Sequence, residues 1–515
     1  MTAIPPILSR SRGALFTTVC GAGLAEAAAM GLAAFATREL FAALHDGRTL
    51  PLHALMMLGG AGAGVALARF TNRIAAESLG QRFATAVRHT LYAKIAALPQ
   101  ADLARRRRGA WALRFVGDLT ILRNWAGNGL PQAATAAIVL PCAALALWLL
   151  NPRLALAGMA PILAALLSMA ALTVIFDPIQ RGLRSGRAAI ATRMIERLAY
   201  APQLDLMGRT QQELRRLDER GQRLRKSAVR RTAAYAGLRM IPDLGAVAGG
   251  VLVLWIAARS GASGAEAAAA LAVLGMIASP LRALAFTWDR YSGWRVAREK
   301  LQAVFDLPDA GRTVERFTRD AASLTVPDGR PVPAGAVLGL TGADARAKTE
   351  WLTRLAGLEN RRPPVSPGVR FRTALIEPGA PILQGSLRRN LTLGVRPRPS
   401  DEAITNVARR LGLAPLMQRL TLDGRVAEGG RGLGRDELAR LLMARAALTR
   451  PALLLIDMPE IFADAGLMAA MRNLIANLHA TTVVSIPAGA PRCIADLTVD
   501  AAALLDDAGC EADIS

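Results

Sequence analysis

Residues 342–349 carry the clearest candidate for phosphate chemistry in the chain. Gly342, Lys348 and Thr349 stand at the spacing of the loop G-x-x-x-x-G-K-[ST], with Ala347 in place of the second glycine. Backbone N–H groups of such a loop surround phosphates, the lysine reaches the terminal ones, and the hydroxyl holds Mg²⁺. Lys348 is one of only four lysines in the chain. The candidate nucleotide-binding residues are therefore Gly342, Arg346, Ala347, Lys348 and Thr349.

A second candidate for phosphate chemistry is Asp457, which directly follows the apolar run 453–456. The run predicts a short buried strand, and a carboxylate at its end is the usual partner for Mg²⁺ and its water. An apolar run at 336–340 predicts a strand before the phosphate loop, and a helix is expected after it. These elements predict an α/β P-loop NTPase domain with Thr349 and Asp457 as the candidate Mg²⁺ ligands, and they leave open whether ATP and Mg²⁺ still bind there.

The composition narrows the class of protein. The chain has 515 residues, a formal charge of +23 and 52% hydrophobic residues, so a disordered protein is excluded. Its four cysteines are spread without metal-like spacing, which excludes a disulfide scaffold. The four scattered histidines pair with no cysteine or carboxylate at metal spacing.

Long apolar stretches place the first 305 residues in a membrane. A span needs about 20 apolar residues, and six stretches qualify, which predicts an all-α six-helix bundle. The expected spans are 13–44, 51–75, 131–151, 153–177, 233–258 and 265–288. Helical apolar spacing continues beyond several of them, so long cytoplasmic helical extensions are expected. Buried helices of a soluble all-α protein are the alternative.

Basic residues indicate the orientation of these spans. Residues 73–130 carry ten basic side chains and residues 181–239 carry fifteen, whereas the short opposite loops offer only Arg48, Arg153 and Arg259. Excess Lys and Arg marks the cytoplasmic side. The pattern predicts a multi-pass protein of the bacterial cytoplasmic (inner) membrane with both termini inside, in contact with lipid and not with nucleic acid. No cleaved signal peptide is expected.

Glu26 is an ionisable group within the first expected span. Such groups are costly and face the bundle or a water-filled cavity. A place in the substrate pathway and a structural pairing with an arginine are both open.

Three further segments give the chain a resemblance to a known family. Glu428-Gly-Gly with Leu433, the run from Arg440 to Ala446, and Gly385 to Leu391 are similar to segments around the signature and glutamine loops of ABC transporters. With the six spans, the chain resembles the exporter type over nearly all its length. The resemblance implies a transmembrane domain at 1–305, a linker at 306–313 and a nucleotide-binding domain at 314–515.

The same resemblance exposes losses at the nucleotide site. Met458 stands at the general-base position, Pro487 at the switch-histidine position, and Pro378 or Glu377 at the glutamine position. Asp344 adds a negative charge facing phosphate. Three further positions belong to the comparison: Ala345 replaces a loop glycine, Phe317 is a weak candidate for an adenine platform, and Glu460 is a candidate displaced base. The signature loop reads Leu433-Gly434-Arg435-Asp436-Glu437.

Hydrolysis needs a positioned base, a metal and charge stabilisation together. We therefore expect weak or absent hydrolysis, with ATP binding still open. The leading hypothesis is a half-transporter of an ABC exporter, the impaired half of a heterodimer with a competent partner. Residues 118–128 and 206–213 would couple it to the nucleotide domains. The alternative is a regulatory or structural membrane protein that keeps the fold without transport.

Overall fold

The computed structural model describes residues 4–104, 111, 114–198, 200–308, 324–326, 330–358, 372–491 and 494–500. The chain divides into two compact units. The first comprises Met1–Ala96 and Ala104–Leu307, and the second Ala97–Leu103 and Pro308–Ser515. The proposed adenine platform Phe317, the arginine run 105–108 and most of the expected linker lie outside the described residues.

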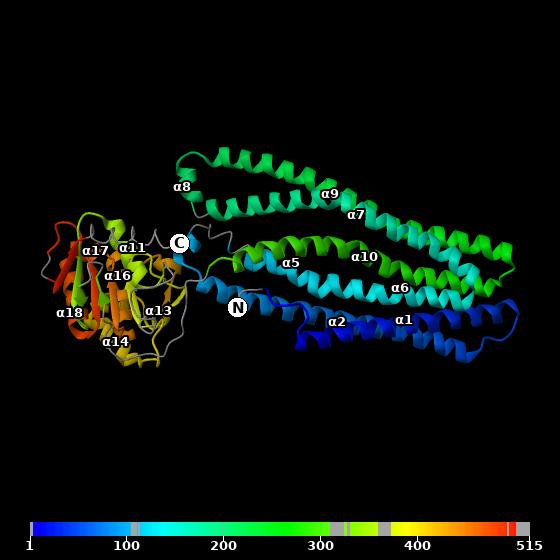
Figure 1. Ribbon diagram of the computed structural model, residues 1–515, viewed down its shortest axis with the longest axis horizontal. Helices are drawn as coiled ribbons and strands as arrows, with labels where there is room; N and C mark the ends of the chain where they lie inside the picture. Colours follow the sequence, from blue (N-terminus) through cyan, green and yellow to red (C-terminus); the bar gives the residue numbers. More distant parts are fainter. Residues whose placement is uncertain are drawn as a thin grey trace. The chain divides into compact units, whose positions relative to one another are not determined.

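The first unit is a bundle of long helices that run side by side (Figure 1). Six of its helical segments are long and apolar enough to cross a membrane, which confirms the predicted six-helix class. The segments are α1 (Arg10–His45), α2 (Leu52–Ala97), Arg114–Leu150, Pro152–Leu172 within α7 (Pro152–Leu198), α9 (Thr210–Ser260) and α10 (Gly264–Phe305). Segment Arg114–Leu150 contains π-helical η1 (Arg114–Asp118), α5 (Leu119–Asn124), π-helical η2 (Trp125–Gly129) and α6 (Leu130–Leu150). The described residues between these segments also contain the short helix α8 (Ala201–Leu206) and the short helix α3 (Gln100–Ala104), most of which belongs to the second unit.

Several of these helices are far longer than a bilayer is thick. Helix α9 has 51 residues, which is about 76 Å at 1.5 Å per residue, against a hydrocarbon core of about 30 Å. The helical extensions predicted beyond the spans are therefore confirmed.

Glycines set the closest helix contacts in this unit. A Cβ on Gly249 of α9 would lie 2.9 Å from the carbonyl oxygen of Gly158 on α7. A Cβ on Gly80 of α2 would lie 2.8 Å from Cα of Gly127 in η2. At these positions only glycine lets the backbones approach so closely.

The second unit is built on a parallel five-stranded sheet, in the order β4-β7-β8-β3-β9. Helices cover both of its faces, with an apolar core on each side. The strands are β3 (Val337–Thr341), β4 (Thr373–Ile376), β7 (Leu453–Ile456), β8 (Thr481–Ser485) and β9 (Leu497–Asp500). Two small antiparallel pairs join β1 (Leu324–Thr325) to β2 (Pro331–Val332) and β5 (Gly385–Ser386) to β6 (Arg425–Val426).

Strands β3, β7 and β8 are buried at every residue, which explains their continuous apolar runs. Within its described residues this unit has the helices α11 (Ala345–Leu355), α13 (Leu387–Leu391), α14 (Asp401–Arg410), α15 (Ala414–Arg419), the 3₁₀ turn η3 (Glu428–Gly430), α16 (Arg435–Thr449), α17 (Glu460–Ala463) and α18 (Ala465–Asn477). A parallel sheet between helix layers is the architecture of an ABC ATPase domain, so the predicted fold class is confirmed.

Candidate functional site

The predicted phosphate loop is shorter than its spacing suggests. After β3, Gly342 takes φ +95° and the chain turns, but α11 begins already at Ala345. Asp344 caps this helix, because its Oδ1 accepts a hydrogen bond from the N–H of Ala347 at 3.0 Å. A loop of this type uses such N–H groups to hold phosphate. Here a carboxylate of the chain itself takes one of them.

Lys348 lies inside the domain and points toward the sheet. It is 3% exposed, and its Nζ donates hydrogen bonds to the carbonyl oxygens of Gly342 at 3.0 Å and Ile486 at 2.9 Å. Gly342 follows β3 and Ile486 follows β8, which are neighbours in the sheet. The lysine thus connects the ends of two strands.

Thr349 and Asp457 meet at the same edge of the sheet. The hydroxyl of Thr349 lies 2.6 Å from Oδ2 of Asp457, and 3.1 Å from the carbonyl oxygen of Ala345. A hydroxyl and a carboxylate at this distance fit two ligands of Mg²⁺, which prefers oxygen. Arg346, the remaining loop candidate, is exposed and pairs with Glu350 at 2.7 Å. Among the described residues no group of three or more His, Cys, Asp or Glu side chains could hold a metal ion.

Glu377 follows β4, beside Asp457 at the end of β7. Burial raises the pKa of the Glu377 carboxyl, and the negative charge of Asp457 raises it further. The position that resembles the glutamine loop therefore adds a second acid to the edge where phosphates would bind.

Neither Met458 at the general-base position nor Pro487 at the switch-histidine position offers a side chain that accepts a proton. Met458 is 2% exposed and packs in one of the two apolar cores of the second unit. Pro487 follows β8 directly after Ile486. Glu460, the candidate displaced base, begins α17, and its Oε2 is buried without a hydrogen-bond partner within the described residues.

The signature-like residues form the start of α16. Leu433 is half-buried and Gly434 precedes the helix, while Arg435, Asp436 and Glu437 form its first turn. Glu437 accepts a hydrogen bond from the N–H of Gly434 at 2.9 Å and two from Arg419 at 2.9 and 3.0 Å. The residues that replace the signature thus bond to each other and to α15.

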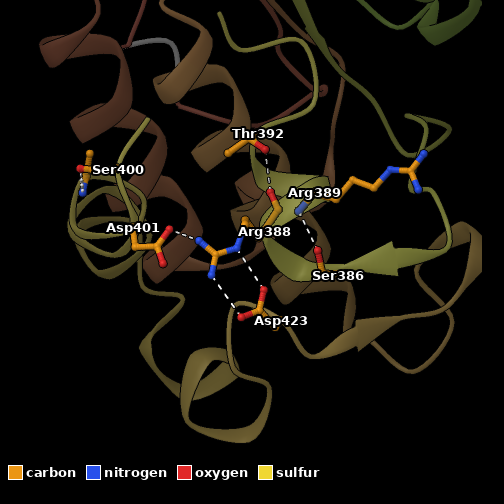
Figure 2. Close-up of polar contacts among 8 residues, drawn as sticks. Ser386, Arg388, Arg389, Thr392, Ser400, Asp401 and Asp423 are labelled. Carbon is orange, nitrogen blue, oxygen red and sulfur yellow. Dashed lines mark hydrogen bonds and ion pairs between the residues drawn. The ribbon is translucent and has the colours of Figure 1, made fainter. Parts of the chain in front are cut away.

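An arginine fixes the segment that resembles the one after the glutamine loop. Arg388 pairs with Asp423 through two hydrogen bonds of 3.1 and 3.2 Å, and also with Asp401 (Figure 2). Ser386 Oγ accepts from the N–H of Arg389 at 3.2 Å. These bonds to Arg388 hold the pKa of the Asp423 carboxyl below its usual range. The network joins α13 to α14 and to the turn before β6.

In the first unit Glu26 is 5% exposed and pairs with Arg69 of α2 at 2.7 Å. Both line a cavity of about 200 Å³ between α1, α2, η2, α6 and α10. Arg73 bonds to Asn128 at 2.6 Å and Asn72 to Thr135 at 2.8 Å across the same cavity.

Sequence reasoning missed three of these cavity residues: Arg69, Asn72 and Arg73. Arg69 and Arg73 fall inside the expected span 51–75, and a charge within a span was the available signal.

Known proteins resemble parts of this chain. The ABC transporter transmembrane region matches residues 20–279. The glutathione/L-cysteine transport system ATP-binding/permease protein CydC of Escherichia coli is 33% identical over 152 residues, which are 28% of this chain and 26% of that protein. CydD of the same-named system from Haemophilus influenzae is 26% identical over 185 residues, 33% of this chain and 31% of the relative.

The mycobactin import ATP-binding/permease protein IrtB of Mycolicibacterium thermoresistibile is 27% identical over 341 residues, 57% of this chain and 58% of that protein. The chain thus spans between about a quarter and three-fifths of the length of these relatives. The family match covers half of the chain and coincides with the six apolar helices. The chain belongs to the ABC transporter family and has the six-span membrane domain of its exporter type.

Proposed function

We propose that the chain is a half-transporter subunit of an ABC exporter and the catalytically impaired half of a heterodimer. The observation that carries the proposal is the phosphate loop, in which Asp344 accepts from the N–H of Ala347. The buried Met458 at the general-base position supports it, because hydrolysis requires a residue that orients or deprotonates water.

ATP and Mg²⁺ would bind weakly in this subunit. Thr349 and Asp457 would hold the metal, which neutralises phosphate charge when it is bound. Lys348 would have to leave the carbonyl oxygens of Gly342 and Ile486 to reach a phosphate, and the Asp344 carboxylate would have to turn away. Both movements break hydrogen bonds and so reduce affinity.

A second, competent half-transporter is the partner that this site requires. Two relatives carry the name of one transport system with different subunit letters, which supports a pair of unlike subunits. The basic connections between spans support insertion in the inner membrane with both termini in the cytoplasm. The domain limits remain as proposed from the sequence, at 1–305, 306–313 and 314–515.

The cavity around Glu26 is the proposed substrate pathway. Because Arg69 neutralises Glu26, the role of this acid in the pathway is to hold an arginine in the cavity wall and not to bind a cation.

ATPase turnover of the purified subunit tests the proposal. We expect turnover near background for this chain alone and clear turnover when it is purified with its partner from the native membrane. Robust turnover of the chain alone that depends on Lys348 would refute the impaired site, and recovery of a homodimer only would refute the partner.

A further inference from the structure

A cavity of about 440 Å³ lies at the edge of the sheet away from the phosphate loop. Strands β4, β7 and β8 are parallel neighbours, so the residues before them meet at one edge. Arg372 precedes β4, Pro451 precedes β7 and His479 precedes β8, and all three line the cavity. Residues of the phosphate loop and Asp457 follow their strands and lie at the opposite edge. The cavity is therefore separate from the nucleotide site.

The wall of this cavity is basic. It contains Arg372, Arg410, Arg450 and His479, together with the amides of Asn473 and Asn477, and none of its described lining residues is acidic. Helices α14, α16 and α18 end at this wall, and each helix end is equivalent to about half a negative charge. The positive charge of the three guanidinium groups is larger than the partial negative charge of the three helix ends together, so the net charge of the cavity wall is positive.

The side chains of two of these arginines are exposed and have no polar partner within the described residues. Within the described part of the chain, the side chains of Arg410 and Arg450 donate no hydrogen bond and form no ion pair. Arg450 also has φ +48°, and among the described residues it is the one non-glycine residue with positive φ. Glycine is the usual residue at such a helix end. The Arg450 N–H donates to the carbonyl oxygen of Ala446 at 3.1 Å and so caps α16. Arginine strains the backbone at this φ, and within the described residues its side chain forms no hydrogen bond or ion pair that offsets the strain.

The floor of the cavity is apolar, which limits what can bind. Five of its residues are aliphatic: Val407, Leu411, Ala447, Leu474 and Leu478. An inorganic ion would leave this floor in contact with water. A ligand with an apolar body and a charged end would cover the floor and reach the arginines.

A second cavity, of about 310 Å³, shares Arg372 and Pro451 with the first. Arg445 lines it, and its Nη2 is buried without a hydrogen-bond partner among the described residues. Its other guanidinium nitrogens donate to the carbonyl oxygens of Asn390 at 2.8 Å and Pro381 at 3.0 Å. The Nη2 group of Arg445 is therefore a further hydrogen-bond donor without a partner among the described residues, in the cavity next to the basic wall.

We infer that this edge of the domain is a binding site for an organic phosphate whose body is apolar or aromatic. The phosphate is held by Arg410 and Arg450, and the body lies on the aliphatic floor. The site does not depend on the proposed transport function, because it uses no residue of the nucleotide site or of the spans.

The test uses the full chain purified in detergent and titrated with 1-naphthyl phosphate, followed by naphthyl fluorescence anisotropy. We expect this probe to bind at least tenfold more tightly than 1-naphthol or inorganic phosphate. Arg410→Gln and Arg450→Gly should each weaken binding about tenfold. Arg409→Gln is the matched control, because Arg409 is the preceding residue on α14, contacts Asn406 and does not line the cavity.

Arg450→Gly also separates loss of binding from loss of folding. Glycine adopts φ +48° without strain, so the melting temperature of this variant should not fall. Equal binding of 1-naphthyl phosphate and 1-naphthol would overturn the proposal. Equal weakening by Arg409→Gln, or no binding of 1-naphthyl phosphate, would overturn it too.

Discussion

Replacing Asp344 with asparagine should tighten ATP binding without loss of the fold. Asparagine caps helices about as well as aspartate, so the hydrogen bond from the N–H of Ala347 should persist. What the change removes is a negative charge at the position where phosphate oxygens would approach. Asp344→Ala would lose the cap as well, at about 1 kcal/mol, and is therefore the less informative variant.

The expected gain follows from the repulsion between two negative charges. A phosphate oxygen that accepts from the N–H of Ala347 must take the place of Oδ1, which lies 3.0 Å from that nitrogen. The displaced carboxylate would remain about 5 Å away, where two unit charges repel by ~2 kcal/mol at an effective dielectric constant near 40. Removing that repulsion corresponds to roughly tenfold to thirtyfold tighter binding.

Isothermal titration of the purified chain with ATP and Mg²⁺ measures the effect. Asp464→Asn is the control, because Asp464 caps α18 through the N–H of Leu467 and lies outside the phosphate loop. If Asp344→Asn binds ATP no better than the parent chain, the carboxylate is not what weakens the site. If Asp464→Asn gives the same gain, net charge alone is responsible.

Three further predictions concern stability, each read from thermal unfolding in detergent. Glu377→Gln should stabilise the protein at neutral pH. Because the pKa of Glu377 is raised in the folded state, the free energy of unfolding falls as pH rises from the pKa of the unfolded state to that of the folded state. Glutamine does not titrate, so the variant should not show this fall. Gly249→Val should cost about 1–3 kcal/mol by overpacking, whereas Gly60→Val, with open space around its Cβ, should cost less than ~0.5 kcal/mol. Glu26→Ala should cost about 2 kcal/mol, less than for a fully buried pair because Arg69 is half-exposed, and Arg69→Ala should restore part of it; additive losses would contradict the pairing.

The sequence predicted the elements whose signal is local. The apolar run 453–456 is strand β7, and the run expected at 336–340 is β3 at 337–341. The six long apolar stretches correspond to six helices that could span a membrane, because length and hydropathy alone decide whether a helix is a candidate span. Helical spacing past the spans likewise predicted the extensions.

The start of α11 was not predicted, although the residues that cause it were visible. The motif led us to expect a loop over residues 342–349, but α11 begins at Ala345. Alanine at 345 and 347 removes the glycines that keep such a loop open, and Asp344 is a strong helix cap. The local helix signal therefore prevailed over the motif.

Contacts between residues far apart in the chain could not be predicted from the sequence. Gly60-Ala-Gly-Ala-Gly64 and Gly245-Ala-Val-Ala-Gly249 have the same small-residue spacing. A Cβ on Gly245 would lie 2.8 Å from that of Ala165, whereas one on Gly60 would meet nothing within 4 Å. Only the packing of α7 against α9 distinguishes them. The pairing of Glu26 with Arg69 depends on tertiary structure in the same way.

The retained motif residues do not by themselves argue for nucleotide binding. Lys348 joins the ends of β3 and β8 through two carbonyl oxygens, and Thr349 joins α11 to Asp457 after β7. Each would be kept for the stability of the sheet edge even if no phosphate ever bound there. A lysine variant that loses ATP could therefore have lost its sheet edge first. Asp344→Asn avoids this ambiguity, since it changes charge at the site and leaves all of these bonds in place.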